Sequence, residues 1–482
     1  MDSSCPGTNL VQLNDTVILF FVNSKTVKHM KLIEFKGTGI RGYMNHHIHF
    51  KESVTFLVGI NGSGKTSILK LISGLTKPSY KTLETIEYSS VELTLTHDTR
   101  IYIISSTKTK DELTIKCNHV ERELKEDTIS RIKKDQRGII DPEELNSIAL
   151  HFEHLSTCQM IMSLSTPIFI GIDRIPEQDV LRFLQRRRLY HFSEQTSFST
   201  VDSSLNTIQE VVFDLYRKNA TKQKKYAEDF RTSVLKEALG LITTNDYRGG
   251  ESIDVVDELS KYESKKSQFV QALSNAGIDD AITMTDNFFK MHRENLDILS
   301  GKSEADDMRK NQAIVGWYVS KAQMDKIGKI IEHETTYETN VNKLNEVFER
   351  FLECANLFFK ESGKEITILD NGLMRVGTSY YNSDGHIKRH LDELTSLSSG
   401  EKQIVALIGS LIFTSSNVRP EVIVIDEPEL SLHLTWQEIF VDAILKAQPN
   451  FQFVLATHSP TIIAKIERRE WCEDLSRPLI QM

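Results

Sequence analysis

Cysteine is scarce in this chain: five residues are present, and they are scattered along its length. No CxxC pair and no histidine at metal-ligand spacing accompanies them, which argues against a zinc site and against a disulfide framework. Scattered thiols fit a reducing cytosol, so we expect a cytoplasmic protein. The five residues are Cys5, Cys117, Cys158, Cys354 and Cys472.

Long hydrophobic runs and an excess of positive charge are also missing. The longest apolar run near the N-terminus, at residues 16–22, is too short to span a bilayer and lacks the features of a secretory signal. We therefore expect a soluble protein with no membrane partner. The formal net charge of −9 does not mark a nucleic-acid binder. The basic runs at residues 185–190 and 222–226 leave phosphate contacts open, but such runs are more often solvated helix faces.

Proline is missing from residues 181–363, where charge rises and apolar residues recur at helical spacing. Strand-like segments occupy both ends of the chain instead, and residues 365–378 predict a hairpin that turns at residues 370–372. With 39% hydrophobic residues, the 482-residue chain can bury a sizeable core. We predict an α/β fold in which residues 1–180 and 364–482 share one sheet, interrupted by a mainly helical insertion of antiparallel helices at residues 181–363.

The motif GINGSGKT at residues 59–66 fits G-x-x-x-x-G-K-[ST] in full, with a buried-strand pattern before it and a helical pattern after it. In such a loop the backbone N–H groups wrap the phosphates, and glycines leave the room for them. We expect Lys65 to reach the β- and γ-phosphates of ATP and the Thr66 hydroxyl to coordinate Mg²⁺. The predicted nucleotide-binding residues are Gly59, Asn61, Gly62, Ser63, Gly64, Lys65, Thr66 and Ser67.

Two further apolar segments end in polar residues. VIVIDE at residues 422–427 describes a buried strand that carries Asp426 to its C-terminal tip, where ligands bind in open α/β sheets. We predict that Asp426 binds Mg²⁺ and that Glu427 orients or deprotonates the attacking water. His458 follows another apolar segment, where it is placed to hydrogen-bond the γ-phosphate. Alone, each of these groups is usually structural, but a complete phosphate loop elsewhere in the chain favours function.

A second small loop rich in serine and glycine, TSLSSGEKQ at residues 395–403, opens a predicted helix. Ser398, Ser399, Gly400 and Glu401 at its start predict a second anion-binding helix N-terminus. Because the first loop already surrounds the phosphates of its own nucleotide, the second is useful if it contacts the γ-phosphate held by another copy of the chain. Two copies would then sandwich two ATP molecules head to tail.

In chain order these four features are the phosphate loop, the serine- and glycine-rich loop, the segment at residues 422–427 and His458, and this order resembles that of the ATP-binding-cassette ATPases. The string DEPELSLHLTWQ at residues 426–437 is similar to their soluble branch, which contains SMC-type, DNA-repair and OLD-family ATPases. The resemblance implies an ABC-ATPase P-loop domain, with the phosphate loop in its N-terminal half and the other three motifs in its C-terminal half. It also implies that Ser431 and His433 lie in a dimer-facing loop.

Size and layout resemble the ATPase subunit of Septu-type antiphage defence systems and related retron-associated ATPases. That resemblance implies an ATP-dependent dimer or higher oligomer that regulates or scaffolds a separate HNH-type nuclease subunit, with DNA contacted through the complex. Ser399 and Glu401 stand where glycine and glutamine are common in the signature of the family. The usual Q-loop glutamine is not evident, and Asp173 and Arg174 stand where that loop should begin, so we expect slow turnover.

Three alternatives compete with this interpretation. A repair- or SMC-type ATPase would clamp DNA directly, although two antiparallel helical runs in this insertion are too short for long SMC arms at ~1.5 Å per residue. A transporter cassette is disfavoured by the lack of a membrane segment. An OLD-type nuclease would need a Toprim domain after His458, and we expect no such domain because the residues up to Met482 leave too little room for one. Residues 292–298 resemble an HNH cluster only superficially. We therefore expect an ATPase that is not itself a nuclease.

Overall fold

The computed structural model describes residues 9–13, 16–20, 30–98, 100–119, 122–132, 142–170, 200–239, 255–278, 282–381, 387–414, 422–430 and 432–476. The chain divides into two compact units, one formed by Met1–Val212 with Arg350–Met482 and the other by Phe213–Glu349. The predicted boundary at residues 180/181 lies outside the described residues. The predicted boundary at 363/364 falls between the short helix η3 (Lys360–Ser362) and strand β11 (Lys364–Ile368).

The first unit contains a parallel sheet whose strands, among the described residues, follow the order β10-β14-β15-β5-β16. The central strands are buried because their sequences, such as VTFLV and VIVID, are apolar almost throughout. Segments from both ends of the chain thus pair side by side, and the α/β prediction is confirmed. The strands are β10 (Ile168–Ile170), β14 (Val422–Asp426), β15 (Gln452–Thr457), β5 (Val54–Val58) and β16 (Cys472–Asp474).

A second sheet in this unit is antiparallel, with the described strands in the order β4-β3-β6-β7-β8-β9. The prediction that both halves share one sheet therefore holds for the parallel strands but not for these. The strands of the second sheet differ from the parallel strands in their burial pattern. In β4, for example, buried and more exposed residues alternate, as they do in half-exposed antiparallel strands. The strands are β3 (Met30–Ile40), β4 (Met44–His49), β6 (Ser90–His97), β7 (Arg100–Lys108), β8 (Glu112–His119) and β9 (Arg122–Ser130).

One hydrophobic core joins the two sheets. Leu57 and Val454 of the parallel sheet and Phe35 of the antiparallel sheet belong to a single buried cluster with Ile72 of helix α1. The buried Gln452 amide adds a polar link between β15 and β3: it accepts a hydrogen bond from Leu32 N (2.8 Å) and donates to Leu32 O (2.9 Å) and Lys51 O (2.7 Å). The helices of this unit include α1 (Lys65–Thr76), α2 (Tyr80–Thr85), α3 (Pro142–Glu153), α4 (Ser156–Met162), α10 (Ser399–Thr414), α11 (Leu434–Ala447) and η5 (Ile466–Trp471).

A smaller antiparallel sheet precedes α10. Strand β11 pairs with β12 (Met374–Tyr381), which pairs with β13 (Ile387–Asp392), and the short helix η4 (Leu394–Ser396) follows. The hairpin predicted at residues 365–378 is confirmed, with Gly372 at its turn in the left-handed region (φ 82°). Strands β1 (Asn9–Leu13) and β2 (Thr16–Phe20) form a separate antiparallel pair.

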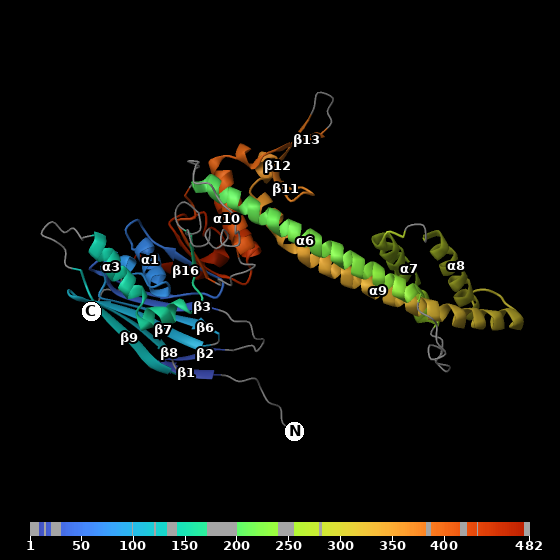
Figure 1. The fold of residues 1–482 in the computed structure, drawn as a ribbon, viewed down its shortest axis with the longest axis horizontal. Coiled ribbons are helices and arrows are strands. Elements are labelled where there is room, and N and C mark those ends of the chain that lie inside the picture. The colour runs from blue at the N-terminus through green and yellow to red at the C-terminus, as the bar shows by residue number, and fades with distance from the viewer. Residues whose placement is uncertain are drawn as a thin grey trace, which may run out of the picture. The chain divides into compact units, whose positions relative to one another are not determined.

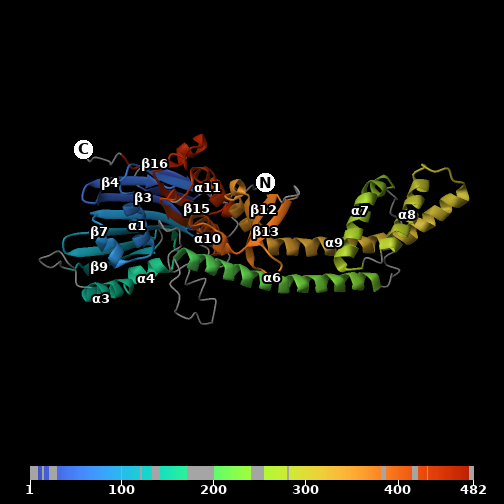
Figure 2. The same cartoon turned by 90° about the horizontal axis from the view of Figure 1, so that it is seen from above.

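The second unit is helical, and its long helices run antiparallel. Tyr216 meets Phe348 at a centroid distance of 5.9 Å, and farther along Phe230 stacks on Tyr337 at 5.3 Å. Contacts thus advance along α6 as they move back along α9, and both views show the pair side by side (Figures 1 and 2). The predicted antiparallel helices are confirmed. The helices are α6 (Thr200–Leu239), α7 (Val255–Ala276), α8 (Ile282–Leu299) and α9 (Asp307–Asn356), of which α6 and α9 also contribute residues to the first unit.

One of the two predicted basic runs can be placed on these helices. The basic run at residues 222–226 lies on α6, with Lys222, Lys224 and Lys225 exposed, whereas the run at 185–190 lies outside the described residues. Within the part of the chain that the structure describes, no helix is both long enough and apolar enough to cross a membrane.

Candidate functional site

The candidate site lies where three neighbouring strands of the parallel sheet end. Because β14, β15 and β5 are adjacent and run in the same direction, their C-terminal ends meet at one edge of the sheet. The Cα register pairs Asp426 with Ala456 and, one residue on, Thr457 with Val58. Glu427 N also donates to Ala456 O at 2.8 Å. The phosphate loop, Asp426, Glu427 and His458 are therefore brought to the same edge from positions far apart in the sequence.

The phosphate loop connects β5 to α1. Gly62 and Gly64 have φ values of 89° and 92°, a backbone conformation that favours glycine. Ser63 N donates to Ile60 O at 3.1 Å, which closes the loop on itself. Helix α1 begins at Lys65, so the N–H groups of its first turn have no intrahelical acceptor and carry the positive end of the helix dipole.

Lys65 is held over this loop. Its buried side chain donates from Nζ to Gly59 O at 2.7 Å and to Ile60 O at 3.2 Å. These carbonyl contacts hold the Lys65 ammonium against the backbone of the phosphate loop. Asn61 and Gly62 are exposed at the rim, whereas Ser63, Gly64 and Ser67 are buried.

Thr66 and Asp426 form the link between the two motifs. The Thr66 hydroxyl lies close enough to the Asp426 carboxylate to lower its pKa, although the residues are far apart in the sequence. Burial raises the pKa of Asp426 and the neighbouring Glu427 charge raises it further, against the opposing effect of the Thr66 hydroxyl. Asp426 Oδ1 is buried, and the described residues offer it no hydrogen-bond partner. Hydroxyl and carboxylate oxygens around one unpartnered acceptor fit a hydrated Mg²⁺ ion, which prefers such ligands.

His458 is oriented by a residue for which the sequence patterns predict no role. Glu429 is buried, and its carboxylate accepts hydrogen bonds from the Thr457 hydroxyl and from His458 N, both at 2.8 Å. His458 Nδ1 lies 3.0 Å from the same carboxylate, so Nε2 is the ring atom left to meet a ligand. The sequence offers one local signal for Glu429, its position three residues after Asp426 in the string DEPE. Only strand pairing brings Glu429 to His458.

The serine- and glycine-rich loop begins α10 with a capping box. Ser398 N donates to Glu401 Oε2 at 2.7 Å, and Glu401 N donates to Ser398 Oγ at 3.4 Å. Burial opposes ionisation of Glu401, but hydrogen bonds from Ser398 and Lys364 outweigh it and lower the pKa of this carboxylate. Glu401 thus faces inward and supports the loop, while Ser398 and Ser399 are exposed on the surface.

Other predicted positions divide into two groups. His433 lies immediately before α11, and its Nδ1 is 3.1 Å from Thr435 Oγ1. Ser431, Asp173 and Arg174 lie outside the described residues.

A family model described as an AAA ATPase domain matches residues 30–463, which include every motif of this edge as well as the helical insertion. The chain belongs to this AAA ATPase domain family. The match spans both halves of the sheet, so the phosphate loop and Asp426 belong to one ATPase domain rather than to two. The fold is accordingly an ABC-ATPase-like P-loop fold with a helical insertion.

Two curated relatives share part of this AAA ATPase domain. "Retron Vc95 probable ATPase" from Vibrio cholerae serotype O1 biovar El Tor is 26% identical over 224 residues, which cover 44% of this chain and 42% of the relative. "Retron Ec83 probable ATPase" from Escherichia coli is 35% identical over 80 residues, or 15% of each chain. The chain therefore spans less than half the length of these relatives in either match.

Solved structures of SMC head domains also align with most of this chain. The head domain from Pyrococcus furiosus with an extended coiled coil, bound to the C-terminal domain of ScpA, aligns over 90% of this chain and 92% of its own, at 12% identity and a TM-score of 0.32. The SMC head domain from Thermotoga maritima aligns over 90% of this chain and 91% of its own, also at 12% identity, with a TM-score of 0.30.

Two residues of the AAA ATPase domain that the sequence patterns do not single out also reach its phosphate loop. Arg41, in the turn between β3 and β4, donates from Nε to Ser67 Oγ at 3.0 Å. His46 is buried, and its Nε2 would lie 3.6 Å from a Cβ added to Gly64. Burial lowers the pKa of His46, and Nε2 has no hydrogen-bond partner among the described residues. The turn after β3, which carries Arg41, and strand β4, which carries His46, therefore form one wall of the site.

Proposed function

We propose that this chain is an ATPase that binds Mg²⁺–ATP at the C-terminal edge of its parallel sheet. The observation that carries the proposal is the contact between Thr66 and Asp426 beside an unpartnered Asp426 oxygen. This contact supplies both Mg²⁺ ligands that a phosphate-loop ATPase needs, next to a complete phosphate loop. When bound, Mg²⁺ would neutralise charge on the β- and γ-phosphates.

The remaining side chains divide the work of hydrolysis. The loop from Gly59 to Gly64 and the first turn of α1 hold the phosphates through backbone N–H groups. Lys65 exchanges its carbonyl contacts for the β- and γ-phosphate oxygens. Glu427 orients or deprotonates the attacking water, and His458, held by Glu429, contacts the γ-phosphate.

The proposed active unit is a dimer that closes around ATP. Ser399 and Gly400 are the parts of the α10 N-terminus available to another copy, because Ser398 N and the Glu401 carboxylate already bond to each other. Exposure of Ser399 supports this role. Each copy would then contact the γ-phosphate held by the other, and hydrolysis would release the pair.

The dimer is proposed to regulate or scaffold a separate HNH-type nuclease in antiphage defence. Two relatives whose names place them in retrons support an assignment to defence systems. The helical unit of Phe213–Glu349 is the part of the chain proposed to meet the partner, since the ATP-binding motifs all lie in the other unit. The chain itself supplies the ATPase and not the nuclease.

Light scattering on a Glu427→Gln variant tests the dimer. This variant should bind ATP without hydrolysing it, so its mass should double when Mg²⁺–ATP is added. Ser399→Arg in the same background is the matched control, because it blocks the contact between copies while leaving the phosphate loop intact. A mass that is the same with and without ATP in the Glu427→Gln variant would contradict the proposed sandwich.

A second candidate function is a DNA-clamping ATPase of the repair or SMC type. It is favoured by the exposed lysines at residues 222–226 on α6. Purification of the tagged chain from its native operon separates the two. Stoichiometric co-elution of an HNH-type nuclease supports the defence proposal, whereas DNA without a nuclease supports the clamp and makes Lys222, Lys224 and Lys225 the residues to replace.

A further inference from the structure

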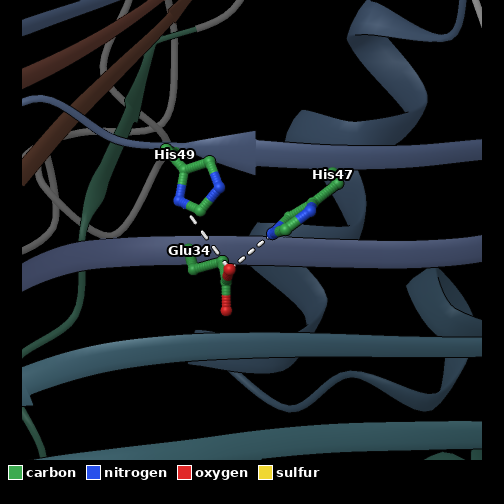
Figure 3. Close-up of side chains that lie close together, drawn as sticks. All are labelled: Glu34, His47 and His49. Atoms are coloured by element: carbon green, nitrogen blue, oxygen red, sulfur yellow. Dashed lines mark hydrogen bonds and ion pairs between the residues drawn. The ribbon is translucent and has the colours of Figure 1, made fainter. Parts of the chain in front are cut away.

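The outward face of the β3–β4 strand pair carries two histidines and a glutamate that the proposed ATPase does not use. Side chains alternate along a strand, so His47 and His49 share the more exposed face of β4, while His46 and Ile48 face the core. In the Cα register, Glu34 of β3 lies opposite His49. Figure 3 shows both imidazoles close to the Glu34 carboxylate, with dashed lines joining each of them to it.

The nitrogen and oxygen atoms of these side chains are already close together. Glu34 Oε1 is hydrogen-bonded to His47 Nε2 and lies 3.7 Å from His49 Nδ1. One potential ligand atom from each of the three residues lies within 4.8 Å of the others. Two ligands that each lie ~2.1 Å from a tetrahedral ion are about 3.4 Å apart. Small rotations of the two imidazoles therefore suffice to bring all three atoms onto one ion.

The carboxylate is arranged as a metal ligand usually is. Lys36 Nζ donates to Glu34 Oε2 at 2.7 Å, which leaves Oε1 directed at the histidines. Ligating carboxylates are commonly held by a hydrogen bond to their second oxygen in this way.

We propose that Glu34, His47 and His49 form a binding site for a divalent transition-metal ion, with Zn²⁺ as the representative ion. Two imidazoles and one carboxylate suit zinc and its neighbours in the first transition row, whereas Mg²⁺ prefers oxygen ligands alone. Three protein ligands leave a coordination position for water. The His47 and His49 side chains are 37% and 60% exposed, which keeps that position accessible. The scarcity of cysteine does not bear on this site, because none of its ligands is a thiol.

A bound ion would fasten β4, an edge strand of its sheet, to β3. The same strand pair carries Arg41 and His46 to the phosphate loop. The ion would therefore stabilise the wall of the nucleotide site from its outer side. The site itself does not depend on the proposed ATPase function, since its ligands are on the opposite face of β4 from His46.

Zinc titration of the full chain without a histidine tag, in competition with a chromogenic chelator, tests the proposal. The wild type should bind one Zn²⁺ ion that His47→Ala, His49→Ala and Glu34→Gln each bind more than about 100-fold more weakly. That bound follows because losing even a hydrogen-bond partner of a metal ligand weakens binding about 10- to 100-fold. Electron paramagnetic resonance with Cu²⁺ as the probe should show two imidazole nitrogens in the wild type and one in each histidine variant.

His390→Ala is the matched control. His390 is an exposed histidine on strand β13 that lies 3.1 Å from a carboxylate oxygen of Asp392, so it has one acidic neighbour in a similar setting. Its replacement should leave zinc affinity unchanged. Equal zinc affinity in the wild type and in both histidine variants would overturn the site, as would a wild-type Cu²⁺ spectrum without imidazole nitrogens. Where one histidine variant fails to fold, the other histidine variant compared with the wild type still decides the matter.

Discussion

Replacing Glu429 with leucine should destabilise the nucleotide-binding unit by about 1–4 kcal/mol. The fully buried Thr457 hydroxyl would lose its acceptor, which costs ~1–3 kcal/mol, and the part-buried His458 N–H would lose the same acceptor at a smaller cost. Glu429→Gln keeps an oxygen for these donors and loses only the charge. Hydrogen bonds to charged groups exceed neutral ones by roughly 1 kcal/mol, so one buried and one part-buried bond predict a loss of about 1–2 kcal/mol. The contact with His458 Nδ1 is left out of this sum because the imidazole is 43% exposed.

Guanidinium chloride unfolding followed by tryptophan fluorescence measures this difference. Trp436 and Trp471 lie in the unit formed by Met1–Val212 with Arg350–Met482, and Trp317 lies in the helical unit. A Trp317→Phe background therefore restricts the signal to the unit that contains Glu429. A glutamine variant as unstable as the leucine variant, or losses below about 0.5 kcal/mol in both, would refute the hydrogen-bond argument. In the folded glutamine variant, kcat for ATP should fall about 10- to 100-fold with ADP affinity unchanged, because His458 is misplaced.

Three further predictions test the site and its support. Gln452→Leu leaves Leu32 N, Leu32 O and Lys51 O without their buried partner, so the free energy of unfolding should fall by about 3 kcal/mol or more. Gln437→Leu, which breaks a different buried amide contact, is the control that shows whether the effect is specific to the link between the sheets. Since the folded-state pKa of Glu401 is lowered, its stabilisation is present above the ordinary glutamate pKa of 4.5 and is lost as the pH falls through the lowered value. Glu401→Gln should therefore flatten the acid limb of the stability curve, and an unchanged limb would mean that the capping contacts are not formed in solution. Since the pKa of Asp426 is raised, protons should compete with Mg²⁺ at higher pH than for an ordinary aspartate. Calorimetric Mg²⁺ affinity in the presence of ATP should therefore weaken as the pH is lowered, and Asp426→Asn should reduce this dependence to that of ATP itself.

Much of the parallel sheet could be predicted because its strands are marked by local sequence. VTFLV and VIVID are continuously apolar, and such runs form strands buried on both faces regardless of the rest of the chain. The turn at Gly372 was equally local, since a hairpin needs a residue that tolerates positive φ. The partition into two sheets was not predictable in the same way. Alternation shows that a strand has one exposed face, but it does not say which strands share a sheet.

The sequence by itself determined the chemistry of the phosphate loop, because Gly62 and Gly64 act through backbone geometry and the Lys65 side chain reaches Gly59 O within the same few residues. Only the tertiary structure decided which distant groups complete the site. Glu429 reaches His458, and Arg41 reaches Ser67, through strand pairing and packing that no local pattern encodes. The same holds for Glu34, which meets His47 and His49 because a one-residue shift in the β3–β4 register would turn these side chains to opposite faces.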